Sequence, residues 1–288
     1  SSLLSASIYS SYGNTVAELG NSELAIIFLN NALSIHEKLK SSINEKRQVL
    51  TNLAKAYRHN KNYKKSEELY RKILADIENS DYDHQTGSSL GGIYNNLAYL
   101  LKVQDKYDES IYYYYESLQL HEKLYGRSHP LTLMIINNLA SAFDKTGETK
   151  KVKELLQTGI ERTEEQFGNT HWRTATSYRS LGIHLFRNEQ PDEAEIHFRE
   201  AFKRYSQNLG PEHLWTAATE IYLAACIYLS SEKSISTSMF ENAYMNLDKR
   251  KNTFTSFDKQ LLSMVLNDIE RYELKEWDGK IELLKKMI

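Results

Sequence analysis

Cysteine, proline and long apolar runs are all scarce in this sequence, and each scarcity excludes a class of protein. The single cysteine, Cys226, cannot form an internal disulfide, which argues against a disulfide-stapled secreted domain and favours a reducing, cytoplasmic location. Only 3 prolines occur among 288 residues, so long helices can run without interruption. No apolar run approaches the roughly 20 residues of a membrane-spanning helix, and we expect no membrane insertion.

An excess of basic residues is also missing. The net charge is −2 and the isoelectric point about 6.5, so the composition does not favour nucleic acid as a partner. Hydrophobic residues make up 41% of the chain, which is enough for a folded core and too much for disorder. The sequence begins Ser1-Ser2-Leu3, without an initiator Met or a signal sequence, so we expect a fragment of a longer chain.

One loop pattern, Gly-x-x-His-x-x-Thr, recurs at a fixed spacing. It begins at Gly126, Gly168 and Gly210, which are 42 residues apart, and it continues with His129, His171 and His213 and with Thr132, Thr174 and Thr216. A fixed period between about 20 and 50 residues is the mark of a stacked repeat array. The sequence therefore predicts a solenoid.

Small and apolar residues recur with the same period before and after these loops. Six copies of one pair are visible, at Tyr12-Gly13, Leu53-Ala54, Leu97-Ala98, Leu139-Ala140, Leu181-Gly182 and Leu223-Ala224. In the second half of each unit, apolar residues follow at spacings of three or four, as in Ala25, Leu29 and Ala32. Such spacing places one stripe on one face of a helix, so each unit is predicted to be a pair of amphipathic helices.

These stripes predict twelve helices, two in each unit. We expect them near residues 3–19, 22–40, 44–59, 63–79, 88–104, 107–124, 131–145, 149–166, 173–187, 191–208, 213–230 and 234–250. The longest connector, residues 79–87, is rich in turn formers and is predicted to be a surface loop. The period fails after Lys251, but helical spacing continues near 256–272 and 276–288. We predict one continuous domain, with the repeat array in residues 1–250 and C-terminal capping helices in residues 251–288.

The pattern resembles the tetratricopeptide repeat, in the long-unit form found in kinesin light chains. The residues that carry the resemblance are Asn137-Asn138-Leu139-Ala140, Phe143 and Gly147, with the loops Gly126-Arg127-Ser128-His129-Pro130 and Gly210-Pro211-Glu212-His213. It covers roughly residues 3–250. The resemblance implies an all-α fold, a right-handed α-solenoid of about six helix pairs closed by capping helices.

Motifs for catalysis, metals and phosphate are incomplete. His36-Glu37 and His121-Glu122 lack the second histidine of a zinc-protease signature, and residues 87–92 lack the Gly-Lys-Ser/Thr of a phosphate loop. His129, His171 and His213 lie in successive repeats, at least about 8–10 Å apart, whereas zinc needs each nitrogen at about 2.0–2.1 Å. We expect their rings to bond backbone at the turns, and we predict no metal, no cofactor and no enzyme.

The candidate site lies on the first helix of each unit. In the tetratricopeptide family these helices line a concave groove, and the resemblance implies that Asn52, Asn96 and Asn138, one residue before the packing Leu, hold the backbone of an extended peptide. Basic and polar residues follow this column by three, six or seven positions and share its face. The predicted peptide-binding residues are Asn52, Lys55, Arg58, His59, Asn96, Tyr99, Lys102, Asn138, Ser141, Lys145, Arg179 and Arg187.

Two functions from different classes follow. The first is a non-enzymatic scaffold or adaptor whose groove captures an extended acidic segment of a protein or peptide. The second is the ligand-sensing repeat domain of a larger signalling protein, such as a nucleotide-dependent switch with its effector elsewhere in the chain. The sequence does not specify the partner or the oligomeric state.

Overall fold

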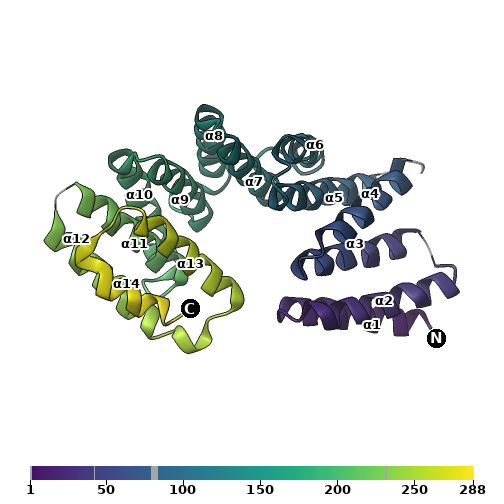
Figure 1. The fold of residues 1–288 in the computed structure, drawn as a ribbon. Coiled ribbons are helices and arrows are strands. Elements are labelled where there is room, and N and C mark those ends of the chain that lie inside the picture. Colours follow the sequence, from purple (N-terminus) through teal and green to yellow (C-terminus); the bar gives the residue numbers. More distant parts are fainter. Residues whose placement is uncertain (1, 42, 79–83, 231) are drawn as a thin grey trace. The chain divides into compact units, whose positions relative to one another are not determined.

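The chain folds almost entirely into helices (Figure 1). The computed structural model describes residues 2–41, 43–78, 84–230 and 232–288, and within these ranges it contains fourteen α-helices, two 3-10 helices and no strand. They form two compact units, residues 1–146 (unit 1) and residues 147–288 (unit 2). The predicted all-α solenoid of helix pairs is confirmed.

Unit 1 consists of seven helices, each of which packs on the next. The first and second helices of its pairs alternate along the chain. Their bounds are α1 (Leu3–Glu18), α2 (Ser22–Lys38), α3 (Ile43–His59), α4 (Tyr63–Glu78), α5 (His84–Val103), α6 (Tyr107–Tyr125) and α7 (Pro130–Thr146).

Unit 2 continues the alternation from α8 to α12 and then departs from it. Helices α8 to α12 pack on their neighbours in order, α13 packs on α11, and α14 packs on α13. The bounds are α8 (Thr149–Phe167), α9 (Trp172–Arg187), α10 (Pro191–Leu209), α11 (Leu214–Leu229), α12 (Lys233–Asp248), η1 (Lys251–Thr253), α13 (Ser256–Glu270), η2 (Lys275–Trp277) and α14 (Asp278–Lys285).

Most helix boundaries lie within two residues of those predicted from the sequence. The main exception is α5, which begins at His84, so His84 to Gly87 are helical and the prediction of a loop there was wrong. Even the glycine in that stretch costs a helix only about 1 kcal/mol, and α5 as a whole packs on α4 and α6. Residues 79–83 of the predicted loop lie outside the described residues. The last helix, α14, ends at Lys285, three residues earlier than expected.

The Gly-x-x-His-x-x-Thr loop is a device that begins a helix. Gly126 has a φ of 93°, which favours glycine, and its carbonyl accepts a hydrogen bond of 2.9 Å from the hydroxyl of Thr132. The ring Nδ1 of His129 accepts the backbone N–H of Leu131 at 3.2 Å and so satisfies one of the unpaired donors at the start of α7. Tyr125 stacks on the same imidazole, with ring centroids 4.9 Å apart.

The other two copies of the loop repeat the histidine cap. Nδ1 of His171 accepts from the N–H of Arg173 at 3.1 Å, and Nδ1 of His213 accepts from the N–H of Trp215 at 3.2 Å. The predicted role of the three histidines at the backbone is therefore confirmed. The threonine bond is present in the second copy, from Thr174 to the carbonyl of Gly168 at 2.8 Å.

The Leu and Ala columns form the core, as predicted. Leu53, Leu97, Leu139, Leu181 and Leu223 are all buried. The first copy of the column differs, because the side chain of Tyr12 is 58% exposed.

Small residues allow the two helices of a pair to approach closely. A Cβ atom added to Gly182 would lie 2.9 Å from the ring of Phe198 on the second helix of that pair. In other pairs, a buried serine of the second helix donates to a carbonyl of the first: Ser66 to Ala54 at 2.7 Å, and Ser110 to Ala98 at 2.7 Å. The small residues and serines of these pairs thus maintain both the close packing of the two helices and their buried hydrogen bonds.

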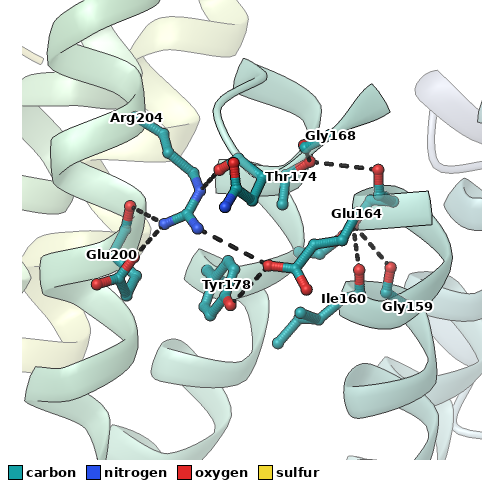
Figure 2. Close-up of polar contacts among 11 residues, drawn as sticks. Gly159, Ile160, Glu164, Gly168, Thr174, Tyr178, Glu200 and Arg204 are labelled. Atoms are coloured by element: carbon teal, nitrogen blue, oxygen red, sulfur yellow. Dashed lines mark hydrogen bonds and ion pairs between the residues drawn. The ribbon is translucent and has the colours of Figure 1, made fainter. Parts of the chain in front are cut away.

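A buried arginine holds the loop between α8 and α9 in unit 2 (Figure 2). The guanidinium of Arg204 donates to the carbonyl of Asn169 in this loop and to the carbonyl of Glu200 at 2.9 Å. It also lies over the ring of Tyr178, 4.5 Å from the centroid, and the Tyr178 hydroxyl donates to Glu164 at 2.9 Å. This network ties α10 to the helices before it.

Candidate functional site

Two of the three asparagines in the predicted column line one cleft of unit 1. Asn52 on α3 and Asn96 on α5 border a cleft of about 570 Å³, together with Lys55, Thr51 and Ser89. Both amides are half-buried, and within the described residues neither makes a hydrogen bond. An amide in this state offers one acceptor and two donor hydrogens to a ligand in the cleft.

The third asparagine already has a partner. The side-chain nitrogen of Asn138 on α7 donates to the side-chain oxygen of Asn95 on α5 at 3.0 Å. This bond fixes the Asn138 amide. Asn95 is not among the site residues predicted from the sequence, although the doublets Asn95-Asn96 and Asn137-Asn138 place adjacent amides at the same position of two repeats.

Two cations of unit 1 lie over the ring of one tyrosine. The Arg58 guanidinium carbon is 4.5 Å from the centroid of the Tyr99 ring, and Lys102 Nζ is 5.2 Å from it. Tyr99 is 37% exposed. Cation–π contacts of this kind contribute about 0.5–1 kcal/mol at exposed sites, so they position the cations without neutralising them.

Lys102 also reaches the next repeat. Its ammonium donates to the hydroxyl of Ser141 on α7 at 3.1 Å. Burial, followed by the positive charge of Lys145, lowers the pKa of Lys102 to about 8. The structure therefore brings Tyr99, Lys102 and Ser141 together, with the charge of Lys145 close enough to act on Lys102.

Burial and neighbouring positive charge also act on Lys55 and His59 of this face. Burial, followed by the charge of Arg58, lowers the pKa of Lys55, and burial with the charges of Arg58 and Lys55 lowers the pKa of His59. Nη2 of Arg58 donates a hydrogen bond of 3.0 Å to Nε2 of His59. Within the described residues, no carboxylate forms an ion pair with Lys55, Arg58, Lys102 or Lys145.

Of the two predicted site residues in unit 2, Arg187 is engaged by the fold itself. Arg187 Nε donates to both carboxylate oxygens of Asp268 on α13 at 3.0 Å, and its Nη2 lies 2.9 Å from one of them. Arg179 also lies in unit 2, and its buried Nε makes no hydrogen bond among the described residues. Arg187 is not presented to an extended peptide as expected, because it pairs with a buried carboxylate of its own unit. The candidate site is therefore the set of ten residues in unit 1.

The described residues contain no cluster of three or more His, Cys, Asp or Glu side chains able to hold a metal ion. Across the same residues, none of the helices has both the length and the apolar character needed to cross a membrane. Cys226 is buried in α11 as a free thiol, which agrees with its predicted place in the core.

A curated relative is the Clustered mitochondria protein homolog of Candida albicans, which is 26% identical to this chain over 222 residues. The match covers 74% of this chain and 16% of the relative. The chain thus spans about a sixth of the length of that relative.

Solved structures share the fold at low sequence identity. The apo form of RapI superposes with a TM-score of 0.67 at 16% identity, and the match covers 98% of this chain and 94% of RapI. A putative kinesin light chain from Podospora anserina with nearly identical TPR-like repeats gives a TM-score of 0.59 at 18% identity, covering 69% of this chain and 94% of that one. These likenesses show a common solenoid fold and include the kinesin light chain type.

The repeat itself is also identified by sequence profile. Tetratricopeptide repeat profiles match residues 89–165 and 173–241, and a second profile of the same repeat matches residues 48–79. The matched segments cover helix pairs described above and include the first and third of the Gly-x-x-His-x-x-Thr loops. This chain belongs to the tetratricopeptide repeat family.

Proposed function

We propose that this chain is a non-enzymatic scaffold or adaptor that binds an extended acidic segment of a partner protein on one face of unit 1. Tetratricopeptide repeats are typically interaction scaffolds without catalysis, and they bind protein or peptide partners. The face, called the unit 1 face below, consists of Asn52, Lys55, Arg58, His59, Asn96, Tyr99, Lys102, Asn138, Ser141 and Lys145. The lone Cys226 thiol favours a cytoplasmic setting for this function.

One observation supports this proposal most strongly: the cations of the unit 1 face have no carboxylate partners among the described residues. On other surfaces of the same unit, cations are paired, as in the contact of Lys106 with Glu67 at 2.8 Å. Burial lowers the pKa of Lys55 and of Lys102, and a neighbouring positive charge adds to the effect, Arg58 for Lys55 and Lys145 for Lys102. A ligand that brings carboxylates to this face would relieve the repulsion.

The asparagines supply the second element of recognition. An extended peptide has alternating N–H and C=O groups, and the free amides of Asn52 and Asn96 can bond both. Each such bond would contribute on the order of 0.5–1.5 kcal/mol and would depend little on salt. The cations would contribute attraction that salt screens over about 8–10 Å.

Calorimetric titration with a probe peptide of alternating Glu and Ser tests both elements. We expect Lys102→Glu to weaken binding strongly in low salt and much less in high salt, because the reversed charge acts through a screened field. Asn96→Ala should weaken binding by a similar amount at either salt concentration.

The matched control is Lys72→Glu. Lys72 is an exposed residue of α4, a second helix, and the substitution changes the net charge by the same amount as Lys102→Glu. It should leave binding of the probe nearly unchanged. Equal weakening by the two reversals would mean that net charge alone attracts the peptide, and the proposed site would be wrong.

The alternative function is a ligand-sensing repeat domain within a larger signalling protein. The same face could serve such a sensor. The full coding sequence discriminates the two: an adjoining phosphate loop supports a nucleotide-dependent switch, whereas an adjoining heptad coiled coil supports an adaptor.

A further inference from the structure

Helix α13 packs on α11 in unit 2 (Figure 1). It carries a carboxylate, Asp268, that bonds residues of both α9 and α11. The side chain of Asp268 is 3% exposed. It accepts two hydrogen bonds from Arg187 on α9 at 3.0 Å and one from the Tyr222 hydroxyl on α11 at 2.6 Å. One residue of α13 thereby joins the first helices of two successive repeats.

The partners of Asp268 occupy the repeat columns that define the unit 1 face. Tyr222 follows Ser180 by 42 residues and Asn138 by twice that number, so it stands in the asparagine column. Arg187 follows Lys145 by 42 residues and stands in the column of His59. In unit 2, the residues in these columns therefore bind a carboxylate of the chain itself, that of Asp268.

The position of α13 is not that of another first helix in the stack. Helix α11, an ordinary first helix, packs closely on α10, the second helix before it. Helix α13 packs instead on α11, and its Asp268 reaches α9. Another first helix of the stack would pack on α12. Trp277 packs there instead, and its ring centroid lies 4.3 Å from that of Phe240 on α12.

Helix α13 has the features of a docked amphipathic helix. Its N-terminus is closed by a capping box between Thr255 and Asp258, so the helix is stabilised locally. Its buried stripe comprises Leu262, Val265 and Ile269. A second anchor follows the helix, where the Tyr272 hydroxyl donates to the carbonyl of Phe186 on α9.

We propose that the α9–α11 face of unit 2 is a second carboxylate-binding site, whose ligand class is an acidic amphipathic helix, and that α13 is its resident ligand. The helix that binds this site carries an aspartate. Apolar residues lie six and three positions before that aspartate and one position after it. While α13 is docked, this site is closed to partners. The proposal is independent of the unit 1 face, which lies in the other unit.

The test combines hydrogen exchange of the full chain with complementation in trans by a synthetic peptide of residues 253–273. In the Asp268→Asn variant, we expect the amides of α13 to exchange at least about tenfold faster, since one partner of a buried ion pair has been removed. The added peptide with Asp268 should restore slow exchange on α11. The same peptide with Asn at that position should bind at least about tenfold more weakly.

Two further variants keep the test decisive. Glu270→Gln neutralises another carboxylate of α13 that is exposed and pairs with Lys285, and it should leave the exchange of α13 unchanged. Tyr222→Phe removes only one of the donors and should give an intermediate increase in exchange. Unchanged exchange in Asp268→Asn, opening of α13 only together with the whole of unit 2, or equal binding of both peptides would each overturn the proposal.

Discussion

Glu189 adopts the left-handed backbone conformation that Gly147 holds 42 residues earlier, with φ of 58° and 78° respectively. Both residues end the first helix of a repeat, and their position requires this conformation. A residue with a Cβ pays about 1–2 kcal/mol for it, whereas glycine loses roughly 0.5–1 kcal/mol in conformational entropy on folding.

Glu189→Gly is therefore expected to stabilise unit 2 by about 0.5–1 kcal/mol. The midpoint of thermal unfolding should rise. Glu189→Ala is the control, because it removes the carboxylate but keeps the Cβ, and it should give no such gain. If the alanine variant is stabilised as much as the glycine variant, the carboxylate and not the backbone causes the strain.

Substitution by alanine of two adjacent glycines of α5 should change the stability of the protein in opposite directions. A Cβ on Gly91 would lie 2.7 Å from the ring of His121, whereas a Cβ on Gly92 has no heavy atom within 4 Å. Gly91→Ala should destabilise the protein by about 1–3 kcal/mol through overpacking. Gly92→Ala should stabilise it by up to about 1 kcal/mol through helix propensity. Urea unfolding of the two variants checks this, and a shared sign would contradict the close approach of α5 and α6.

The core column can be tested at Leu139, which is fully buried on α7. Leu139→Ala should cost about 2–5 kcal/mol of unfolding free energy, because it removes apolar contacts and leaves a cavity. Met134, on the same helix and 43% exposed, provides the control substitution Met134→Ala. If Leu139→Ala lowers the unfolding free energy no more than Met134→Ala does, the Leu column does not form the core.

Acidic-peptide binding by the unit 1 face should depend on pH through Lys102. Burial, followed by the charge of Lys145, lowers the pKa of Lys102 to about 8, and a carboxylate ligand prefers its charged form. Affinity should therefore be full near pH 7 and fall roughly tenfold as the pH rises through 8 to 9.5, since a bond to a charged group contributes about 1.5–3 kcal/mol.

Calorimetry in buffers of different ionisation enthalpy should also show proton uptake on binding near pH 8. Lys102→Arg is the matched control, because its guanidinium stays charged throughout this range. An equally steep fall of affinity in the arginine variant would assign the pH dependence to another group.

The repeat period by itself determined most of the fold. Each unit buries its apolar stripe against its neighbours, so local spacing fixes both the helices and the columns, as Leu97 and Leu139 show. The Gly-x-x-His-x-x-Thr loop was equally readable, because the glycine and the histidine act within a few residues of each other. The loop predicted over His84 to Gly87 was wrong, because the composition of these residues is that of a turn whereas the structure begins α5 at His84.

Only the tertiary structure decided which of the repeated positions are already occupied by contacts within the chain. The sequence places Arg187 in line with Lys145, but it does not show that Asp268, 81 residues farther on, fills the space beside it. It also does not show that Asn138 is engaged by Asn95, or that Arg58 and Lys102 meet over the ring of Tyr99. A periodic pattern specifies positions that repeat, whereas contacts made by a helix outside the period, or by side chains of different repeats, depend on three-dimensional packing that no local pattern encodes.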